Sequence, residues 1–487
     1  MRALLSFLFV TIFANAQAQT VTGLGMFENL PQGVYANPAF QPTARYNFGI
    51  PALSGVAINH SNNWLRPSSD LLYSDASGNL TLNASEVLAG IDAIAHTGQS
   101  ASFELFHAGI KVGSHYFRLS AAERFSASID LPKDIFRLAV YGNVGHNEFE
   151  NNTADFSGLA VDGLHYREYA LGYSFHLDKK WEFGVAAKLL YGMERIRTEE
   201  SSLTLRTDPD TYDLQSAGAF QVQTSGIYGL TTDESTAVQE DLGNYLLGLK
   251  NWGLGGDIGA AFKPNEKWKI EASVLNLGFI KWQSDVATYG TDDASFLYGG
   301  LDLTDIVFLE GSDFNDGLQD RIDSLVDVLE NTYGFERKSE SFNTGINALA
   351  RYAASYEIYK NQASSGKAWA TLTHGLGQSS APFSIGLGYN QSLKRWLEAS
   401  VHASYRKDYS PSVGAGLVLN AGPVQFYAMV ENFRFAQYSR ITWREGGDGE
   451  ESAVPYFSNA SDLRVQFGLN LTFGREELSP KGRPMKR

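Results

Sequence analysis

Alternation of apolar and polar residues constrains the fold of this sequence more than any other feature. The clearest case is the segment 463–473, in which apolar residues occupy every second position. The apolar set is Leu463, Val465, Phe467, Leu469, Leu471 and Phe473, and the residues between them are Arg464, Gln466, Gly468, Asn470 and Thr472. Successive side chains of a β-strand point to opposite faces. Such a strand suits a barrel wall with lipid on one side and a polar lumen on the other.

The same rhythm predicts about 14 strands, an even number of the kind that membrane barrels use. The predicted strands are 44–60, 101–113, 115–131, 163–177, 181–198, 251–263, 268–282, 344–359, 367–377, 382–391, 396–407, 410–421, 423–436 and 462–474. A further run, 214–225, lies in a long connection, and we expect it to extend a hairpin above the membrane. The fold class is therefore all-β, a transmembrane antiparallel barrel with long extracellular loops.

The N-terminus predicts export. Met1-Arg2 precedes an apolar run, and Ala-x-Ala spacing ends at Ala16 or Ala18, which together indicate a secretory signal peptide over residues 1–18. Beyond it no apolar stretch approaches the roughly 20 residues of a spanning helix, so only a closed barrel would satisfy the backbone in lipid. The competing fold is a soluble β-sandwich, whose outward face is polar, whereas large aromatic residues recur here on the apolar faces.

Three turns predict the sidedness of the barrel. A basic residue directly precedes Trp181, Trp268 and Trp396, and Trp with neighbouring Lys or Arg prefers the membrane interface. The long connections 61–100, 132–162, 199–250, 283–343 and 437–461 all fall on the opposite side. Because outer-membrane barrels have short periplasmic turns and long extracellular loops, we expect the Trp turns to face the periplasm and the protein to lie in the cell outer membrane.

The segment Gly33-Val34-Tyr35-Ala36-Asn37-Pro38-Ala39-Phe40 resembles the Asn-Pro-Ala segment of the FadL-like family of long-chain fatty-acid transporters, which includes the secretion protein PorV. The run 273–282 also looks like a strand of the uncharacterised FadL-like barrels of Bacteroidota. The resemblance implies a 14-stranded barrel with an N-terminal plug, or hatch, that contains Asn37, Pro38 and Ala39. It divides the chain into a hatch at 19–43, a barrel at 44–474 and a periplasmic tail at 475–487.

Charged residues occupy many of the predicted inward positions, which departs from an apolar fatty-acid path. The residues expected to face the lumen are Glu182, Lys188, Asp257, Lys269, Glu271, Arg351, Glu398, His402, Arg406, Glu431 and Arg464. Opposite charges of this kind predict a salt-bridged and partly filled interior. The tail also departs from the family, since a polar, basic segment follows Phe473.

The connection 283–343 is predicted to be an acidic extracellular loop, because it holds 14 acidic and 3 basic residues. Leu318, Ile322, Leu325 and Leu329 recur at helical spacing within it, which indicates a short helix that acts as a lid, docks a partner or packs on its own barrel. The run 313–317 offers oxygen ligands for calcium but lacks the EF-hand spacing, so we predict no metal site. His402, between Ser400 and Ser404, fits lumen packing as well as chemistry.

Two functions follow from these features. The first is passive, hatch-gated transport of a small amphipathic or hydrophobic molecule. The second is a non-enzymatic accessory or scaffold barrel of an outer-membrane secretion or assembly complex. We expect no catalytic residues, because phosphate-loop, zinc and nucleophile-elbow motifs are missing from the sequence, and we expect no cofactor. The expected partners are the lipid bilayer, lipopolysaccharide and outer-membrane or periplasmic proteins. The net charge of −15 gives no basic surface for nucleic acid.

Overall fold

A closed antiparallel barrel of 14 strands forms the body of the protein. The computed structural model describes residues 22–64, 72–74, 80–142, 149–227, 250–298, 338–361, 363–377, 383–393, 396–407, 409, 411–432, 437–444, 451–458 and 462–474. The wall consists of β1 (Tyr46–Gly49) with β2 (Val56–Asn62), β5 (Ile94–Val112), β6 (His115–Pro132), β8 (Ala160–His176), β9 (Trp181–Ser201), β12 (Asn251–Phe262), β13 (Trp268–Trp282), β15 (Phe342–Gly345) with β16 (Leu349–Lys360), β17 (Ser364–Gly375), β18 (Ser384–Leu393), β19 (Leu397–Arg406), β20 (Ser412–Ala421), β21 (Val424–Glu431) and β24 (Asp462–Phe473).

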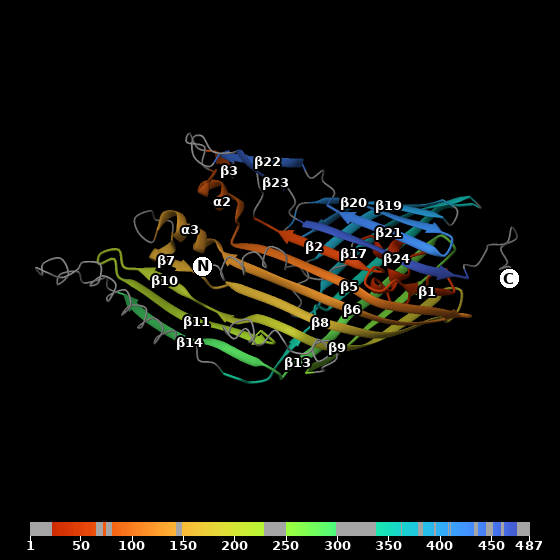
Figure 1. Cartoon of the computed structure of the whole chain (residues 1–487), viewed down its shortest axis with the longest axis horizontal. Coiled ribbons are helices and arrows are strands. Elements are labelled where there is room, and N and C mark those ends of the chain that lie inside the picture. The colour runs from red at the N-terminus through yellow and green to blue at the C-terminus, as the bar shows by residue number, and fades with distance from the viewer. Residues whose placement is uncertain are drawn as a thin grey trace, which may run out of the picture.

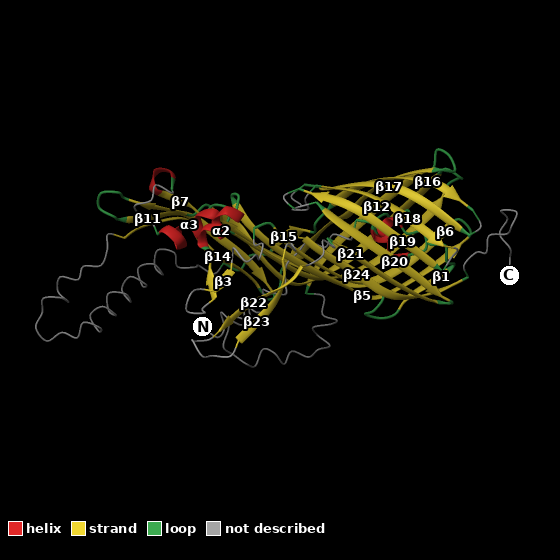
Figure 2. Cartoon of the chain, turned by 90° about the horizontal axis from the view of Figure 1, so that it is seen from above, coloured by secondary structure: helices red, strands yellow, loops and turns green. Residues whose placement is uncertain are grey.

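The last strand closes the barrel by pairing with the first. Tyr46 of β1 lies opposite Phe473 of β24, and Val56 of β2 lies opposite Phe467. Each remaining wall strand pairs with its neighbours in chain order, so the wall has no free edge (Figures 1 and 2). The prediction of a 14-stranded antiparallel barrel is therefore confirmed.

Burial in the wall is inverted relative to a water-soluble protein. On β24, Arg464 and Asn470 are buried, while Phe467 and Phe473 are exposed. Leu171 is 63% exposed on the outer face. A soluble protein rarely exposes a continuous apolar surface of this kind, whereas a lipid-facing barrel wall requires it.

Two wall strands are interrupted where the sequence predicted continuous ones. β1 and β2 replace the single strand 44–60, because Pro51 has no N–H for the strand ladder and Ala52 adopts a φ of 60°. β15 and β16 likewise replace the strand 344–359. Ile346 lies at that second interruption and is buried inside the barrel.

A sheet extension continues the wall beyond the long-loop end of the barrel (Figures 1 and 2). The far end of β9 pairs with β11 (Leu214–Ser225), and β11 pairs with both β10 (Thr204–Thr207) and β14 (Val286–Tyr298). β7 (Thr153–Asp155) pairs with β10. β11 has the place predicted for the run 214–225, but β10 and β14 lie in connections that were predicted to be loops.

The smaller elements lie mostly at the long-loop end. They are α2 (Ala84–Gly90), α3 (Lys133–Tyr141), η3 (Glu150–Asn152), the pair β3 (Leu72–Ser74) with β4 (Leu80–Leu82), and the pair β22 (Gln437–Arg444) with β23 (Glu451–Ser458). None of the helices in the described part of the chain is long and apolar enough to cross a membrane. The predicted signal peptide, acidic-loop helix, calcium-like run and C-terminal tail lie outside the described residues.

Candidate functional site

The N-terminal segment lies inside the barrel as a plug, seen as the red segment within the strands in Figure 1. This plug, residues 22–44, contains two short 3-10 helices, η1 (Leu24–Met26) and η2 (Pro31–Tyr35). Leu24, Phe27 and Leu30 pack with inward side chains of the wall, including Tyr427. These plug residues are at most 1% exposed, so the segment has its own apolar contacts within the lumen.

The Asn-Pro-Ala segment rests on a pair of wall glycines. Gly184 on β9 and Gly259 on β12 lie directly opposite each other. A Cβ atom built on Gly259 would lie 2.1 Å from Asn37 Oδ1, and one on Gly184 would lie 2.1 Å from the carbonyl oxygen of Pro38. Only glycine allows this close approach. We call this glycine pair the hatch seat.

Hydrogen bonds hold Asn37 in that place. Its Nδ2 donates to the carbonyl of Ala260 at 3.2 Å, and its Oδ1 accepts the N–H of Ala39 at 2.9 Å. The Asn side chain therefore connects the plug to β12 and also closes a local turn after Pro38. The plug carbonyl of Ala36 accepts a further bond from Ser273 Oγ at 2.9 Å.

Other wall strands bind the plug on its remaining sides. Tyr35 donates to Glu104 on β5 at 2.8 Å, and the N–H of Glu28 donates to Glu398 on β19 at 3.1 Å. Asn390 Nδ2 donates to the carbonyl of Met26 at 3.0 Å. The plug is therefore held on several sides of the barrel.

An amide cluster fixes the plug next to the barrel closure. Gln32 Nε2 donates to Asn470 Oδ1 at 3.0 Å and to the carbonyl of Ser54 at 3.0 Å. Asn470 Nδ2 donates in turn to Gln425 Oε1 at 3.0 Å. Ser54 lies in the interruption between β1 and β2, so that interruption provides an acceptor for the plug.

Most of the charged residues predicted to face the lumen are buried and paired. Glu431 contacts Arg464 at 3.3 Å and His402 at 3.7 Å, and Arg464 also contacts Asp462 at 3.0 Å, as does Arg406. The N–H and hydroxyl of plug residue Thr22 both donate to Glu431, at 3.1 and 2.6 Å. This network links the start of the plug to three wall strands, β19, β21 and β24.

A second network crosses the opposite wall. Lys188 contacts Asp257 at 2.9 Å and Glu168 at 3.3 Å, and Arg124 contacts Glu168 at 3.2 Å. Buried charges in this arrangement are tolerated because each carboxylate faces a cation. Above it, next to the interruption at Ile346, the interior becomes apolar. The buried members of that apolar cluster are Leu164, Tyr166, Leu190, Ile280, Trp282, Val286 and Ile346.

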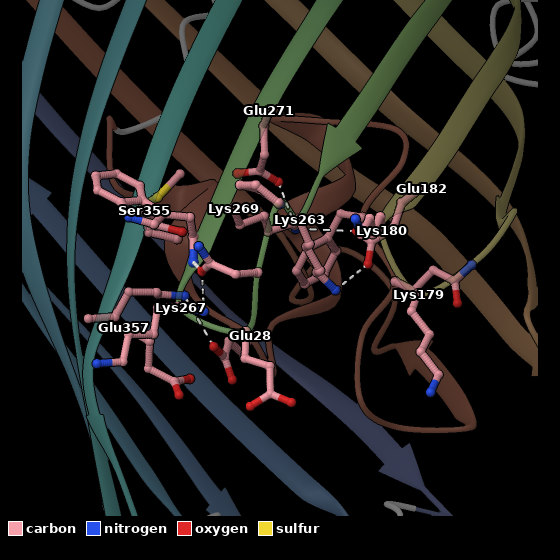
Figure 3. A pocket seen from close by; sticks show the side chains of 18 of the residues that line it. Glu28, Lys179, Lys180, Glu182, Lys263, Lys267, Lys269, Glu271, Ser355 and Glu357 are labelled. Atoms are coloured by element: carbon pink, nitrogen blue, oxygen red, sulfur yellow. Dashed lines mark hydrogen bonds and ion pairs between the residues drawn. The ribbon is translucent and has the colours of Figure 1, made fainter.

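A cavity of about 660 Å³ separates the plug from the wall at the short-turn end (Figure 3). We call it the mouth cavity. Lys269 contacts Glu271 at 2.8 Å and Glu182 at 3.5 Å, and Lys263 also pairs with Glu182. Several further lysines line the cavity, including Lys179, Lys180, Lys267, Lys360 and Lys367.

Plug residue Glu28 belongs to the mouth cavity. Its carboxylate contacts Lys367 Nζ at 3.3 Å. The positive charge of Lys367, helped by Lys360, lowers the pKa of Glu28 to about 2. The plug therefore meets a positive potential where it faces the short-turn end.

A second, smaller cavity of about 60 Å³ lies in the lumen beside Thr22 and Tyr35 of the plug. We call it the central cavity. Its wall residues include Arg124, Lys188, Asp257, Arg351 and Arg464. It thus brings together predicted lumen residues from strands on opposite sides of the barrel, whereas Lys269, Glu182 and Glu271 belong to the mouth cavity.

Several residues that hold the plug were not singled out from the sequence. Glu104, Gln32 and Asn470 are buried and bind the plug or form part of it. Asn470 has the inward position that the alternation of β24 predicts, so that signal was available. Glu104 lies at a register shift of β5, and such a shift is not visible in the alternation.

The fold and the site together define a membrane barrel with a plugged, charge-lined lumen. No cluster of three or more metal-ligating side chains occurs among the residues that the structure describes. The chain belongs to a family of unknown function, DUF5723, whose model matches residues 38–431. No curated protein matches it.

Several solved structures resemble the chain at low identity. The toluene transporter TodX of Pseudomonas putida is 8% identical, with 94% of this chain and 98% of that one covered and a TM-score of 0.40. The toluene transporter TbuX of Ralstonia pickettii is 9% identical, with 92% and 93% covered and a TM-score of 0.37. A FadL homologue of Pseudomonas aeruginosa is 11% identical, with 95% and 99% covered and a TM-score of 0.39.

Proposed function

We propose that this protein is an outer-membrane barrel that admits a small molecule passively, and that movement of its N-terminal plug opens the path. The hatch seat is the observation that carries the proposal. Two facing wall glycines leave room for Asn37 and Pro38, and a wall without a plug has no need of such a recess. The polar contacts of the plug are hydrogen bonds and ion pairs, each worth about 1 kcal/mol, which water can replace when the plug moves.

The membrane location is part of the proposal. The exposed apolar wall supports contact with lipid, and the long loops at one end support an extracellular position for that end. Residues 1–18 supply the export signal, which is cleaved, and residues 475–487 form a periplasmic tail. The strand number and the Asn-Pro-Ala plug support the FadL-like relation. The mixed lumen, with charged networks below and an apolar cluster above, supports an amphipathic rather than a purely hydrocarbon path.

Deleting residues 20–40 tests the plug. The deletion should leave an assembled barrel, shown by heat-modifiable gel mobility, that conducts ions in planar lipid bilayers. The full-length protein should conduct little under the same conditions. Equal conductance from the two assembled proteins would overturn plug gating.

A scaffold function is the second candidate, and the sheet extension supports it. β11 and β14, of 12 and 13 residues, continue the sheet beyond the wall. The extension would offer main-chain groups and loops to other proteins. Co-purification from native membranes is the test. A partner that is retained by the full protein and lost when residues 204–225 are replaced by a short linker would favour the scaffold, whereas no retained partner would count against it.

A further inference from the structure

Arg351 is a buried cation in the lumen. It lies on β16, is 5% exposed, and its Nη2 has no hydrogen-bond partner. Within the described part of the chain it forms no ion pair. Glu271 acts on it electrostatically from farther away, but that carboxylate is in contact with Lys269 at 2.8 Å. A buried charge without a partner is costly, so this position calls for an explanation.

The other cations of the central cavity are compensated. The pairs are Lys188 with Asp257 at 2.9 Å, Arg124 with Glu168 at 3.2 Å, and Arg464 with Glu431 at 3.3 Å. Carboxylates therefore compensate these three cations of the central cavity. Arg351 is the exception, and its Nη2 lies close to the plug, 3.1 Å from where a Cβ on Gly25 would be.

The central cavity has a mixed polar and apolar lining. Thr371, Thr373 and Ser384 line it together with Arg351, and Leu275 and Leu349 also contribute. Its volume of about 60 Å³ has room for about four water-sized groups. That space fits an oxyanion headgroup and is too small for a long hydrocarbon chain.

We propose that Arg351 binds the oxyanion group, a carboxylate or phosphate, of the molecule that the barrel admits. This inference rests on the proposed transport function and names its substrate class as a small hydrophilic anion or an anion with a short apolar part. A guanidinium offers paired N–H donors that match the two oxygens of such a group. The hydroxyl of Thr371 and one hydroxyl of the hydrogen-bonded pair Thr373 and Ser384 add donors that tolerate either anion. The bound anion would supply the negative charge that no wall carboxylate provides to Arg351 among the described residues.

Calorimetric titration of the full-length protein in nonionic detergent tests the site. The probes are inorganic phosphate, acetate and hexanoate, with hexanol as the uncharged analogue. We expect at least one anion to bind, Arg351→Gln to weaken it at least tenfold, and hexanol to bind no better than the mutant binds the anion. Binding of phosphate or acetate indicates a free small anion, whereas binding of hexanoate alone indicates an anion carried on an apolar group; both support the site.

Lys180→Gln is the matched control, because it removes a cation of the mouth cavity that does not line the central one. Its anion affinity should equal that of the wild type. Arg351→Lys keeps the charge and should bind with intermediate affinity, which covers the case in which Arg351→Gln fails to assemble. Absence of anion binding to the wild type, equal binding by Arg351→Gln, or equal binding of hexanoate and hexanol would overturn the site.

The plug-deletion conductance distinguishes this inference from the proposed function. A conducting deletion with no anion binding to the full-length protein removes the Arg351 site and leaves plug gating intact. Anion binding that depends on Arg351, together with a deletion that does not conduct, removes the transport role and leaves an anion site in the lumen.

Discussion

Substitution of Gly259 by Ala should loosen the plug. The new Cβ would lie 2.1 Å from Asn37 Oδ1 and 2.8 Å from Pro38 Cδ, whereas an ordinary contact needs more than about 3.4 Å, so Asn37 must move by roughly 1 Å. Overpacking of this kind costs about 1–3 kcal/mol. Loss of the Asn37 bonds to Ala260 and Ala39 adds about 1 kcal/mol each. Even about 2 kcal/mol raises the open fraction about 30-fold, at about 1.4 kcal/mol for each factor of ten.

Single-channel recording in planar bilayers measures that fraction directly. Gly345→Ala is the matched control, because a Cβ there meets only the carbonyl of Gly278 at the ordinary distance of 3.8 Å. We expect more frequent or longer openings from the Gly259 variant and wild-type behaviour from the control. If the assembled Gly259 variant stayed as closed as the wild type, then either the wall yields or the hatch seat does not hold the plug, and the reasoning from the glycine pair would be refuted.

Three further predictions concern sidedness, the wall and pH. On intact cells, a membrane-impermeant thiol reagent should label Cys introduced at Asp210 and not at Lys179, and the reverse pattern would invert the topology. Leu171→Arg should impair folding by about 2–4 kcal/mol, as for a midplane Arg facing lipid, and a normal assembly yield in heat-modifiable gels would contradict the assigned outer face. Because the pKa of Glu28 is lowered to about 2 by Lys367, its ion pair stabilises the plug above the ordinary Glu pKa of 4.5 and is lost as the pH falls toward 2. Conductance should rise over that interval in the wild type and lose this dependence in Glu28→Gln, and an unchanged rise in the variant would assign the effect to another group.

The wall of this protein was predictable because its signal is local. Each strand alternates over its own length, as at Leu463 to Phe473, and the lipid and lumen faces follow from that period alone. The interruption near Pro51 was predictable in principle from the missing N–H. The interruption at Ile346 was not, because Ile346 joins a buried apolar cluster with Ile280 and Trp282 of the paired strand β13, and this packing is not visible in the local sequence.

The sheet extension was missed for a related reason. The segment that forms β14 alternates weakly and lies in a connection that is acidic as a whole, so the entire connection was predicted to be a loop. Its strand conformation comes from pairing with β11, in which Leu214 lies opposite Tyr298 and Ser225 lies opposite Val286. Pairing between segments some 70 residues apart in the sequence overrides the local conformational preference of each segment. The sequence of β14 alone does not indicate that it pairs with β11.

The plug and its seat show why a candidate site is harder to predict than a fold. The Asn-Pro-Ala resemblance was enough to expect a hatch, and inward charges such as Lys188 were visible from the alternation. Their partners were not, because Lys188 meets Asp257 and Glu168 only once three strands are placed in register. The role of the hatch-seat glycines is harder still to predict, because a glycine within a strand ordinarily indicates a less stable strand or a β-bulge. The role of Gly184 and Gly259 depends on their close approach to Pro38 and Asn37, which are more than a hundred residues away in the sequence. The recess can therefore be recognised only in the folded structure, with the plug in place.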